Sequence, residues 1–283
     1  MKTGWEIVHG RFGPRMVLLG PWSQDAAAAF AAQGVTELEL NYAKGWEGDY
    51  SFLRRHPELE VVEIIDRTTE DVTAVNDLPS LRRLKVFTYC RTSLEFRRWP
   101  KLQECSIEWR PEAQSLAECT QLESIFINRW NGGEDLRSFS AMSKLVQLRL
   151  KGPSRLRSLD GIEGNNRLQE LEIALATRLS NIQALEGMRS LRRLSFDTCK
   201  KIGDLQVVAT LEGLEDLIFG NCGEIESLAP LRGLESLRRV VFYESTKIKD
   251  GDLSPLESLP ALESVAFQNR RHYSHRDSDF ATS

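Results

Sequence analysis

One six-residue pattern recurs along almost the whole chain and limits what the chain can fold into. The pattern is an apolar residue, two variable residues, an apolar residue, one variable residue and an apolar residue. It begins at Val35, Leu59, Leu81, Leu102, Leu122, Leu145, Leu168, Leu191, Leu214, Leu237 and Leu262. Successive starts lie 24, 22, 21, 20, 23, 23, 23, 23, 23 and 25 residues apart. Such a period indicates stacked structural units, because a single unit of this size cannot bury its own apolar face.

The L-x-x-L-x-L pattern at this period resembles the strand signature of leucine-rich repeat proteins. The second half of several repeats resembles the bacterial internalin-like type, since apolar residues recur every three positions in I-E-S-L-A-P-L-R-G-L, from Ile225 to Leu234. The resemblance covers residues 35–267. It implies a curved α/β solenoid, or horseshoe, with a parallel sheet on the concave side and short helices or 3₁₀ turns on the convex side. It also implies a bacterial, non-catalytic protein that binds another protein.

The pattern also predicts which side chains are buried. The fourth and sixth residues of each repeat point inward, so Leu148, Leu171, Leu194 and Leu217 should form one column. A second apolar column on the convex side contains Leu78, Trp99, Cys119, Met142, Met188, Leu211, Leu234 and Leu259, and is interrupted at His56 and Asn165. Trp46 and Trp130 are also expected in the core.

The family usually carries Asn or Cys three residues after the last strand residue. Cys199 and Cys222 match this position, whereas Pro153, Ala176 and Ser245 depart from it. Cys199 and Cys222 should stack on adjacent turns as buried thiols, although a disulfide or a metal pair is conceivable. Among the cysteines, Cys90 is expected to be the exposed one.

We expect one continuous domain in three regions. Residues 1–34 form an N-terminal cap made of a hairpin and a helix, with Ser23 as the helix N-cap and Gly34 after its end. Residues 35–268 contain the eleven repeats. Residues 269–283 form a polar tail with little apolar surface to bury, which is either a loose tail or a thin cover over the last repeat.

Composition excludes several classes of protein. The chain of 283 residues is 41% hydrophobic, which argues against disorder, and near its start it has no apolar run that approaches the ~20 residues of a membrane span. The first residues do not form a signal peptide, and five scattered cysteines favour a reducing compartment, so we expect a cytoplasmic protein. A net charge of −4 disfavours nucleic acid and anionic membranes as partners.

Catalytic and metal-binding motifs are weak. The sequence has four histidines and contains no Gly-rich phosphate loop, G-x-S-x-G elbow or H-E-x-x-H. Two alternatives stay open, namely a metal site at His272, His275 and Asp277 and acid–base chemistry at carboxylate pairs such as Glu37 and Glu39. We expect neither a catalytic residue, nor a metal, nor a cofactor.

The outward strand positions carry charges of both signs. The acids are Glu37, Glu39, Glu63, Asp66, Glu104, Glu108, Glu170, Glu172, Asp197, Asp216 and Glu244. The bases are Arg83, Lys85, Arg129, Arg149, Lys151, Arg193 and Arg239. Their signs alternate in blocks, with an acidic block on the first two repeats. A mixed face of this kind favours a specific protein partner over a polyanion.

Outward aromatic residues mark the candidate binding site. Tyr42, Phe87, Trp109 and Phe126 are all expected on the concave face with Arg129 beside them, and Arg149 and Lys151 follow on the next repeat. Exposed aromatic residues and arginine are typical of interface hot spots. The partner-binding hypothesis covers an inhibitor, an immunity protein or an effector. The alternatives are structural filling by these rings and carbohydrate binding.

Overall fold

The computed structural model describes residues 4–280. These residues belong to two compact units, Met1–Ile127 and Asn128–Ser283. The repeat pattern continues through the border, because Ile127 is the sixth pattern residue of the fifth repeat. The expected division into a cap, eleven repeats and a tail stays a prediction.

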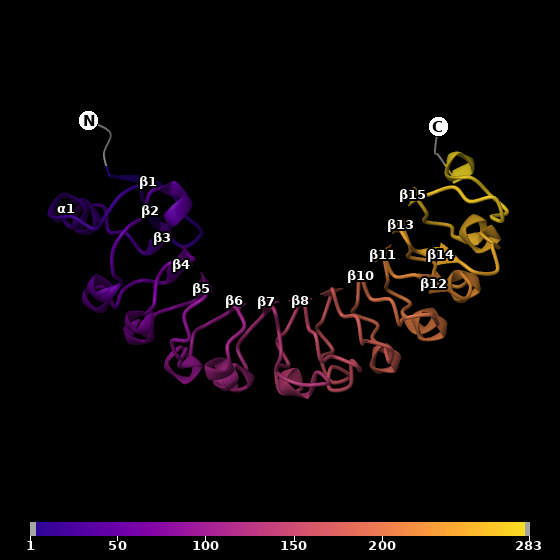
Figure 1. The fold of residues 1–283 in the computed structure, drawn as a ribbon, viewed down its shortest axis with the longest axis horizontal. Helices are drawn as coiled ribbons and strands as arrows, with labels where there is room; N and C mark the ends of the chain where they lie inside the picture. The colour runs from indigo at the N-terminus through magenta and orange to yellow at the C-terminus, as the bar shows by residue number, and fades with distance from the viewer. Residues whose placement is uncertain (1–3, 281–283) are drawn as a thin grey trace. The chain divides into compact units, whose positions relative to one another are not determined.

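The first unit contains a sheet whose strands follow one another in chain order (Figure 1). Its strands are β1 (Trp5–His9), β2 (Pro14–Leu18), β3 (Glu37–Asn41), β4 (Val61–Asp66), β5 (Arg83–Thr88), β6 (Glu104–Glu108) and β7 (Ser124–Asn128). β1 and β2 form an antiparallel hairpin, and β2 then pairs with β3 in parallel. The hairpin therefore supplies the hydrogen-bonding partner for the first strand of the repeats.

A single α-helix, α1 (Gln24–Ala32), connects the hairpin to β3. It begins at Ser23, whose Oγ accepts a hydrogen bond from the backbone N–H of Ala26 at 3.1 Å. It ends at Gln33, and Gly34 follows with φ 59°, a left-handed conformation that favours glycine. Both predicted helix ends are confirmed. Phe30 packs this helix against the rings of Trp22 and His56.

The second unit continues the same arrangement. Its strands are β8 (Gln147–Lys151), β9 (Glu170–Ala174), β10 (Arg193–Asp197), β11 (Asp216–Gly220), β13 (Arg239–Tyr243) and β15 (Ser264–Phe267), and β12 (Glu224–Ile225) pairs separately with β14 (Lys247–Ile248). The six strands of the larger sheet are parallel and in register. This register places Leu148, Leu171, Leu194 and Leu217 side by side, so the predicted core column is confirmed.

Short 3₁₀ helices connect the strands of both units. They are η1 (Tyr42–Lys44), η2 (Ser51–Arg55), η3 (Thr73–Asp77), η4 (Phe96–Arg98), η5 (Pro111–Glu118), η6 (Arg137–Phe139), η7 (Gln183–Leu185), η8 (Gln206–Thr210), η9 (Ala229–Leu231), η10 (Ser254–Ser258) and η11 (Asp277–Phe280). Those from η2 to η10 lie on the side away from the strands (Figure 1), while η1 follows β3 directly and η11 follows β15. Three-residue apolar spacing suits this helix, because side chains at i and i+3 align on one face. The predicted fold class is therefore confirmed. No helix in residues 4–280 is both long and apolar enough to cross a bilayer.

The core fills the space between the strands and the 3₁₀ helices. Every residue of the predicted convex column from Leu78 to Leu259 is buried, as are Trp46, Trp99 and Trp130. Asn165, which interrupts the column, is also fully buried, and its Nδ2 donates to the carbonyl oxygen of Met142 at 2.9 Å. The amide thus replaces an apolar side chain by satisfying a backbone acceptor.

Strands β7, β8, β9, β10, β11 and β13 are each followed by a backbone turn that the sequence analysis missed. The second residue after the sixth pattern position has a positive φ in every case: Arg129 (56°), Gly152 (67°), Leu175 (61°), Thr198 (56°), Asn221 (50°) and Glu244 (57°). The N–H of each of the first five donates to a carbonyl oxygen of the next repeat, as in Leu175 to Asp197 at 2.8 Å. This cross-repeat hydrogen bond holds a conformation that costs a non-glycine residue about 1–2 kcal/mol.

A second set of cross-repeat bonds uses buried side chains. The thiols of Cys199 and Cys222 each donate to the carbonyl of the sixth pattern residue one repeat earlier, Ile173 and Phe196 respectively, at 3.4 Å. Burial raises the pKa of both thiols, to about 12 and about 11, so they stay protonated donors. Both cysteines are thus buried thiols, as predicted. Ser245 is not their equivalent, because Thr246 takes this place and its hydroxyl donates to Phe219 O at 3.2 Å.

The C-terminal segment contains more packing than the sequence analysis expected. Tyr273 lies against the rings of Phe242 and Phe267, and its hydroxyl accepts a hydrogen bond from the N–H of Ile248 at 2.9 Å. Phe280 also contacts Phe267, with ring centroids 6.3 Å apart. Of the two alternatives that the sequence leaves open, these contacts favour the thin cover for residues up to 280, because isolated aromatic residues pack without any apolar periodicity. Residues 281–283 of the predicted tail lie outside the described residues.

Candidate protein-binding surface

The face of each sheet turned away from the 3₁₀ helices is called here the outer sheet face. In the first unit, strand register arranges its side chains in rows that cross the strands. One row is Arg15, Glu37, Val61, Arg83 and Glu104, and the next is Val17, Glu39, Glu63, Lys85 and Ser106. A third row contains Asn41, Ile65 and Phe87. Residues about one repeat apart in the chain are therefore direct neighbours on this surface.

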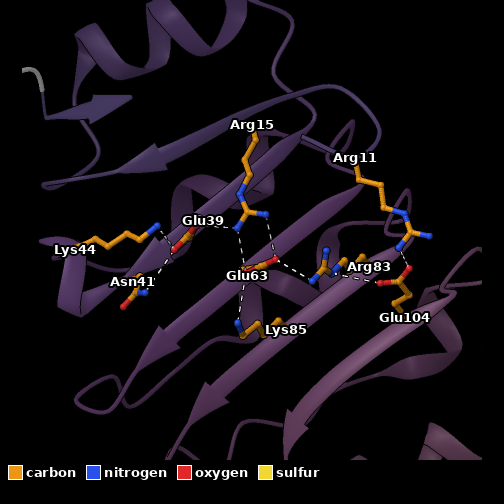
Figure 2. A network of polar contacts seen from close by, with 9 residues as sticks. All are labelled: Arg11, Arg15, Glu39, Asn41, Lys44, Glu63, Arg83, Lys85 and Glu104. Atoms are coloured by element: carbon orange, nitrogen blue, oxygen red, sulfur yellow. Dashed lines mark hydrogen bonds and ion pairs between the residues drawn. The ribbon is translucent and has the colours of Figure 1, made fainter. Parts of the chain in front are cut away.

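Three acidic residues of the first two rows, Glu39, Glu63 and Glu104, are joined to bases in one network, which Figure 2 shows. Arg15 is its centre, with Nη2 2.8 Å from Glu39 Oε2 and 3.1 Å from Glu63 Oε2. Lys44 Nζ lies 2.9 Å from Glu39 Oε1. Arg83 and Lys85 approach Glu63 from the other side at 3.4 and 3.6 Å.

The same network extends to a third carboxylate. Arg83 Nε is 3.5 Å from Glu104 Oε2, and Arg11 from the hairpin loop also pairs with Glu104. Glu37 lies beside this network and is buried, accepting a hydrogen bond from the N–H of Phe12.

These contacts neutralise the acidic block that the sequence predicts on the first two repeats. Burial raises the pKa of Glu39, but hydrogen bonds from Lys44 and Arg15 outweigh it, and the pKa is lowered overall. Glu39, Glu63 and Asp66 are all buried. Glu39 and Glu63 lie on the outer sheet face as expected, but they are not open charges, because Arg15 of the hairpin pairs with both and was not counted with the repeats. The position of Arg15 on a strand preceding the first repeat was the available signal. Asp66 is instead covered at Tyr50 and Thr68, from which it accepts hydrogen bonds.

The predicted aromatic residues of the first unit lie on or beside the same face. The rings of Phe87 and Phe126 meet edge to face with centroids 5.9 Å apart. Both rings are half-buried, as is Trp109 immediately after β6. Lys85 Nζ lies 5.7 Å from the centroid of the Phe87 ring. Partial exposure of these rings leaves apolar surface on a face whose nearby acids are already paired.

Tyr42 lies apart from the Phe87–Phe126 pair. It begins η1, next to the N-terminal edge of the network, and 40% of its surface is exposed. The guanidinium of Arg67 lies 6.0 Å from its ring centroid. Tyr42 therefore belongs to the same unit as Phe87 and lies beside the network.

The three basic residues of the predicted binding site, Arg129, Arg149 and Lys151, belong to the second unit. Lys151 is exposed at the end of β8, and Arg149 is half-buried on the same strand. Arg129 is exposed in the left-handed turn after β7, where its N–H donates to Lys151 O at 2.6 Å. Arg129 and Lys151 are therefore brought together through the backbone.

The outer sheet face of the second unit also carries paired charges. Asp216 lies between two arginines, 3.4 Å from Arg193 Nη1 and 3.3 Å from Arg239 Nε. The neighbouring row changes along the sheet from Arg149 and Glu172 to Ile218 and Val241. The part of this face near the C-terminal strands is thus more apolar than the part near β8.

Side chains that could carry acid–base chemistry or bind a metal are hydrogen-bonded to other groups of the protein. An open pocket of about 490 Å³ in the first unit is lined by Trp46, Glu47, Gly48, Asp49, Tyr50, Ser51, Arg54, Asp66, Thr68, Thr69, Glu70, Asp71 and Ala74. Its buried carboxylate, Asp66, accepts hydrogen bonds from Tyr50 and Thr68. Although burial raises the pKa of Asp66, these bonds lower it overall, so Asp66 is an acceptor for the loop rather than a proton donor.

The histidines near the C-terminus contact protein groups. His272 Nε2 is 2.9 Å from Ile248 O, and His275 Nε2 is 3.1 Å from Glu257 Oε1. Asp277 instead accepts a hydrogen bond from the side chain of Asn269 at 2.6 Å. Among residues 4–280 no three His, Cys, Asp or Glu side chains are grouped as a metal would require.

Comparison with solved structures agrees with this geometry. The chain is similar to an internalin (inlF) from Listeria monocytogenes, with a TM-score of 0.57 and 19% identity, over 78% of this chain and 71% of that one. It is also similar to an internalin C2 (inlC2) from the same organism, with a TM-score of 0.50 and 17% identity, over 76% and 84% of the two chains. The repeated strand and 3₁₀ units together with these likenesses settle the fold. The chain has the leucine-rich-repeat fold.

A further match is to a structure described as a TDR receptor. The TM-score is 0.64 at 17% identity, and the match covers 87% of this chain but 45% of that one. No family model matches the sequence, and no curated protein matches it. The likenesses therefore concern the leucine-rich-repeat fold alone.

Proposed function

We propose that this protein is a non-catalytic interaction module that binds another protein on the outer sheet face of its first unit. Phe87, Trp109 and Phe126 would supply the contact, with Tyr42 beside them. The observation that carries the proposal is the edge-to-face pair of Phe87 and Phe126, which stays partly exposed on a face whose acids are already paired. Rigid, partly exposed aromatic rings are the side chains that most often dominate protein interfaces.

The charges of this face suggest the chemistry of the partner. Glu39 and Glu63 are held by Arg15, so the face offers few unpaired acids to a basic partner. The partner would therefore present an apolar or aromatic anchor to the rings. In the second unit, Arg129, Arg149 and Lys151 would bind acidic groups of a partner and contribute less to affinity, because exposed charge pairs are worth little in water.

Binding of this type is compatible with an inhibitor, an immunity protein or an effector, each of which acts by occupying a partner's surface. Support for a protein partner comes from the leucine-rich-repeat fold shared with internalins, and from the ring composition of the face. Location in the bacterial cytoplasm is part of the same proposal, since the chain contains five unbridged thiols.

The test begins with affinity capture from lysate and continues with the purified partner. Replacing Trp109 with Ala should raise the dissociation constant about 30-fold or more. Truncating an interface hot spot costs at least ~2 kcal/mol of binding free energy, and each 1.4 kcal/mol changes the dissociation constant tenfold. Glu244→Ala, an exposed position of the second unit, is the control and should change affinity little. Calorimetry gives the affinities, and circular dichroism checks that both variants are folded.

Two results would reject the site. If Trp109→Ala unfolds while its folded fraction binds normally, the ring is structural. If Trp109→Ala, Phe87→Ala and Phe126→Ala are all folded and all bind as wild type, the partner uses another surface. Binding of purified oligosaccharides with loss in the same variants would favour the carbohydrate alternative instead.

A further inference from the structure

Cys90 has an environment unlike that of the other cysteines. Among residues 4–280, Cys105, Cys119, Cys199 and Cys222 are buried, whereas Cys90 is half-buried in the segment after β5. Burial raises the pKa of Cys105 above its ordinary range and that of Cys119 to about 11. These thiols are protonated and inaccessible. Cys90 alone of the five combines access to solvent with polar neighbours.

The most important neighbour is a buried arginine. Only 3% of the surface of Arg110 is exposed, and its guanidinium is charged at any physiological pH. Its Nη1 points at Cys90 Sγ at 3.7 Å. Within residues 4–280 no carboxylate forms an ion pair with Arg110, and its buried Nε–H has no hydrogen-bond partner.

A buried guanidinium without a counter-ion is costly, since removing an ion from water must be offset by an opposite charge or by hydrogen bonds. The other acceptors are neutral, namely Thr88 Oγ1 at 3.0 Å from Nη2 and Thr92 O at 3.2 Å from Nη1. Cys90 is the ionisable group that Arg110 contacts. Ionisation of this thiol would supply the missing negative charge.

Hydroxyl groups complete the arrangement. Thr88 Oγ1 lies 3.1 Å from Cys90 Sγ while also accepting from Arg110. Accepting from Arg110 leaves the Thr88 hydroxyl hydrogen available to the sulfur. Burial raises the pKa of Cys90, but hydrogen bonds from Thr88 and from the backbone N–H of Thr92, together with the charge of Arg110, outweigh it, and the pKa is lowered overall.

We propose that Cys90 is a reactive thiolate held by Arg110 and Thr88, and that it is a site of oxidation to a sulfenic acid by hydroperoxides. A sulfur lone pair of the thiolate attacks the terminal peroxide oxygen, a sulfur–oxygen bond forms, and the oxygen–oxygen bond breaks. Sulfur loses two electrons and becomes a sulfenic acid, while the peroxide gains them. The departing oxygen leaves as hydroxide or alkoxide and takes a proton from solvent.

The surrounding charges define the pH dependence of this site. Tyr50 is a phenol that senses the charge of Cys90, and its pKa is raised by burial first, and further by its bond to Asp66 and by the negative charge of Cys90. Tyr50 therefore stays neutral. Asp66 and Asp71 face the same loop, but Asp66 is held by Tyr50 and Thr68 and Asp71 by Thr73 and Thr92. Arg110 is then the charged group in contact with the thiol.

Two measurements on the reduced full-length protein test the proposal. The first is the rate of alkylation by iodoacetamide at each cysteine from pH 5.5 to 9, followed by peptide mass spectrometry. At pH 6 Cys90 should react at least about tenfold faster than N-acetylcysteine, and its titration midpoint should lie below the ~8.5 of an unperturbed thiol. The second is treatment with hydrogen peroxide in the presence of dimedone, which should label Cys90 and leave buried Cys105 unlabelled.

Variants assign the effect to its neighbours. Thr88→Val keeps the side-chain shape, removes the hydroxyl and should raise the alkylation midpoint of Cys90. Arg110→Met should raise it further, and Arg110→Lys should restore part of the effect. The wild-type measurements decide the proposal even if a variant misfolds. A wild-type midpoint at or above ~8.5, or peroxide labelling no faster than for N-acetylcysteine, would overturn it. None of these readouts requires the proposed partner.

Discussion

Replacing Arg15 with Met should destabilise the first unit far more than loss of an ordinary surface arginine. The side chains of Arg15, Glu39 and Glu63 are 17%, 10% and 7% exposed, so the network is mostly shielded from water. Removing one partner of a buried ion pair costs about 3–5 kcal/mol. Because Lys44, Arg83 and Lys85 remain near the two carboxylates, we expect about 2–3 kcal/mol. At about 2–4 °C per kcal/mol, thermal unfolding followed by circular dichroism should shift down by roughly 5–10 °C.

The same variant should show a defined pH dependence. Burial raises the pKa of Glu39 in the folded chain, but the hydrogen bonds and charges of Lys44 and Arg15 outweigh burial. The pKa of Glu39 is therefore lowered overall. Its contribution to stability is therefore present above the ~4.3 of an unfolded glutamate and is lost as pH falls through the lower folded value. The difference in stability between wild type and Arg15→Met should be complete at pH 7 and should shrink below about pH 4.3.

Arg238→Met is the matched control. Arg238 also pairs with a glutamate across neighbouring strands, but Arg238 and Glu263 are 53% and 61% exposed. Exposed pairs of this kind contribute about 0–1 kcal/mol. If the two variants lose equal stability, or if Arg15→Met loses less than about 0.5 kcal/mol, the network is not a buried structural element and the reasoning fails.

Two further substitutions test local features of the second unit. Leu175→Gly should stabilise the protein by about 0.5–1 kcal/mol in urea unfolding, because glycine relieves the left-handed strain at φ 61°, whereas Gly152→Ala at the equivalent position should destabilise it. If Leu175→Gly instead lowers the free energy of unfolding, packing of the leucine side chain contributes more to stability than the left-handed strain costs. Tyr273→Ala should lower the free energy of unfolding by about 2 kcal/mol, because ring packing on Phe242 and Phe267 is lost. An unchanged melting temperature would instead indicate that the C-terminal segment is a loose tail.

The repeat pattern predicts the core well because the core depends on side-chain type at fixed spacing. Leu171 and its neighbours in the column align as expected, and the strands start within the predicted motifs. The left-handed turns were not predictable from composition. Glycine occupies that turn at Gly152, while Leu175 and Thr198 adopt the same conformation and donate their N–H groups to carbonyl oxygens of the next repeat.

Charge on the outer sheet face was predicted less well. Counting charges repeat by repeat assigns Glu39 and Glu63 to an open acidic block, although Arg15 pairs with both. The partner comes from a hairpin outside the repeats, so no repeat-based count includes it. Thr246 gives a smaller example, because one additional residue after β13 moves the buried donor one position beyond Ser245.

The row arrangement of the outer sheet face has a consequence for immunology and peptide mapping. Val17, Glu39, Glu63, Lys85 and Ser106 are neighbours in space but come from five separate stretches of chain. An antibody that recognises such a row has a discontinuous epitope. Overlapping synthetic peptides shorter than one repeat would each contain a single member of the row. A library of that kind would therefore fail to capture such an antibody, whereas the folded protein would bind it.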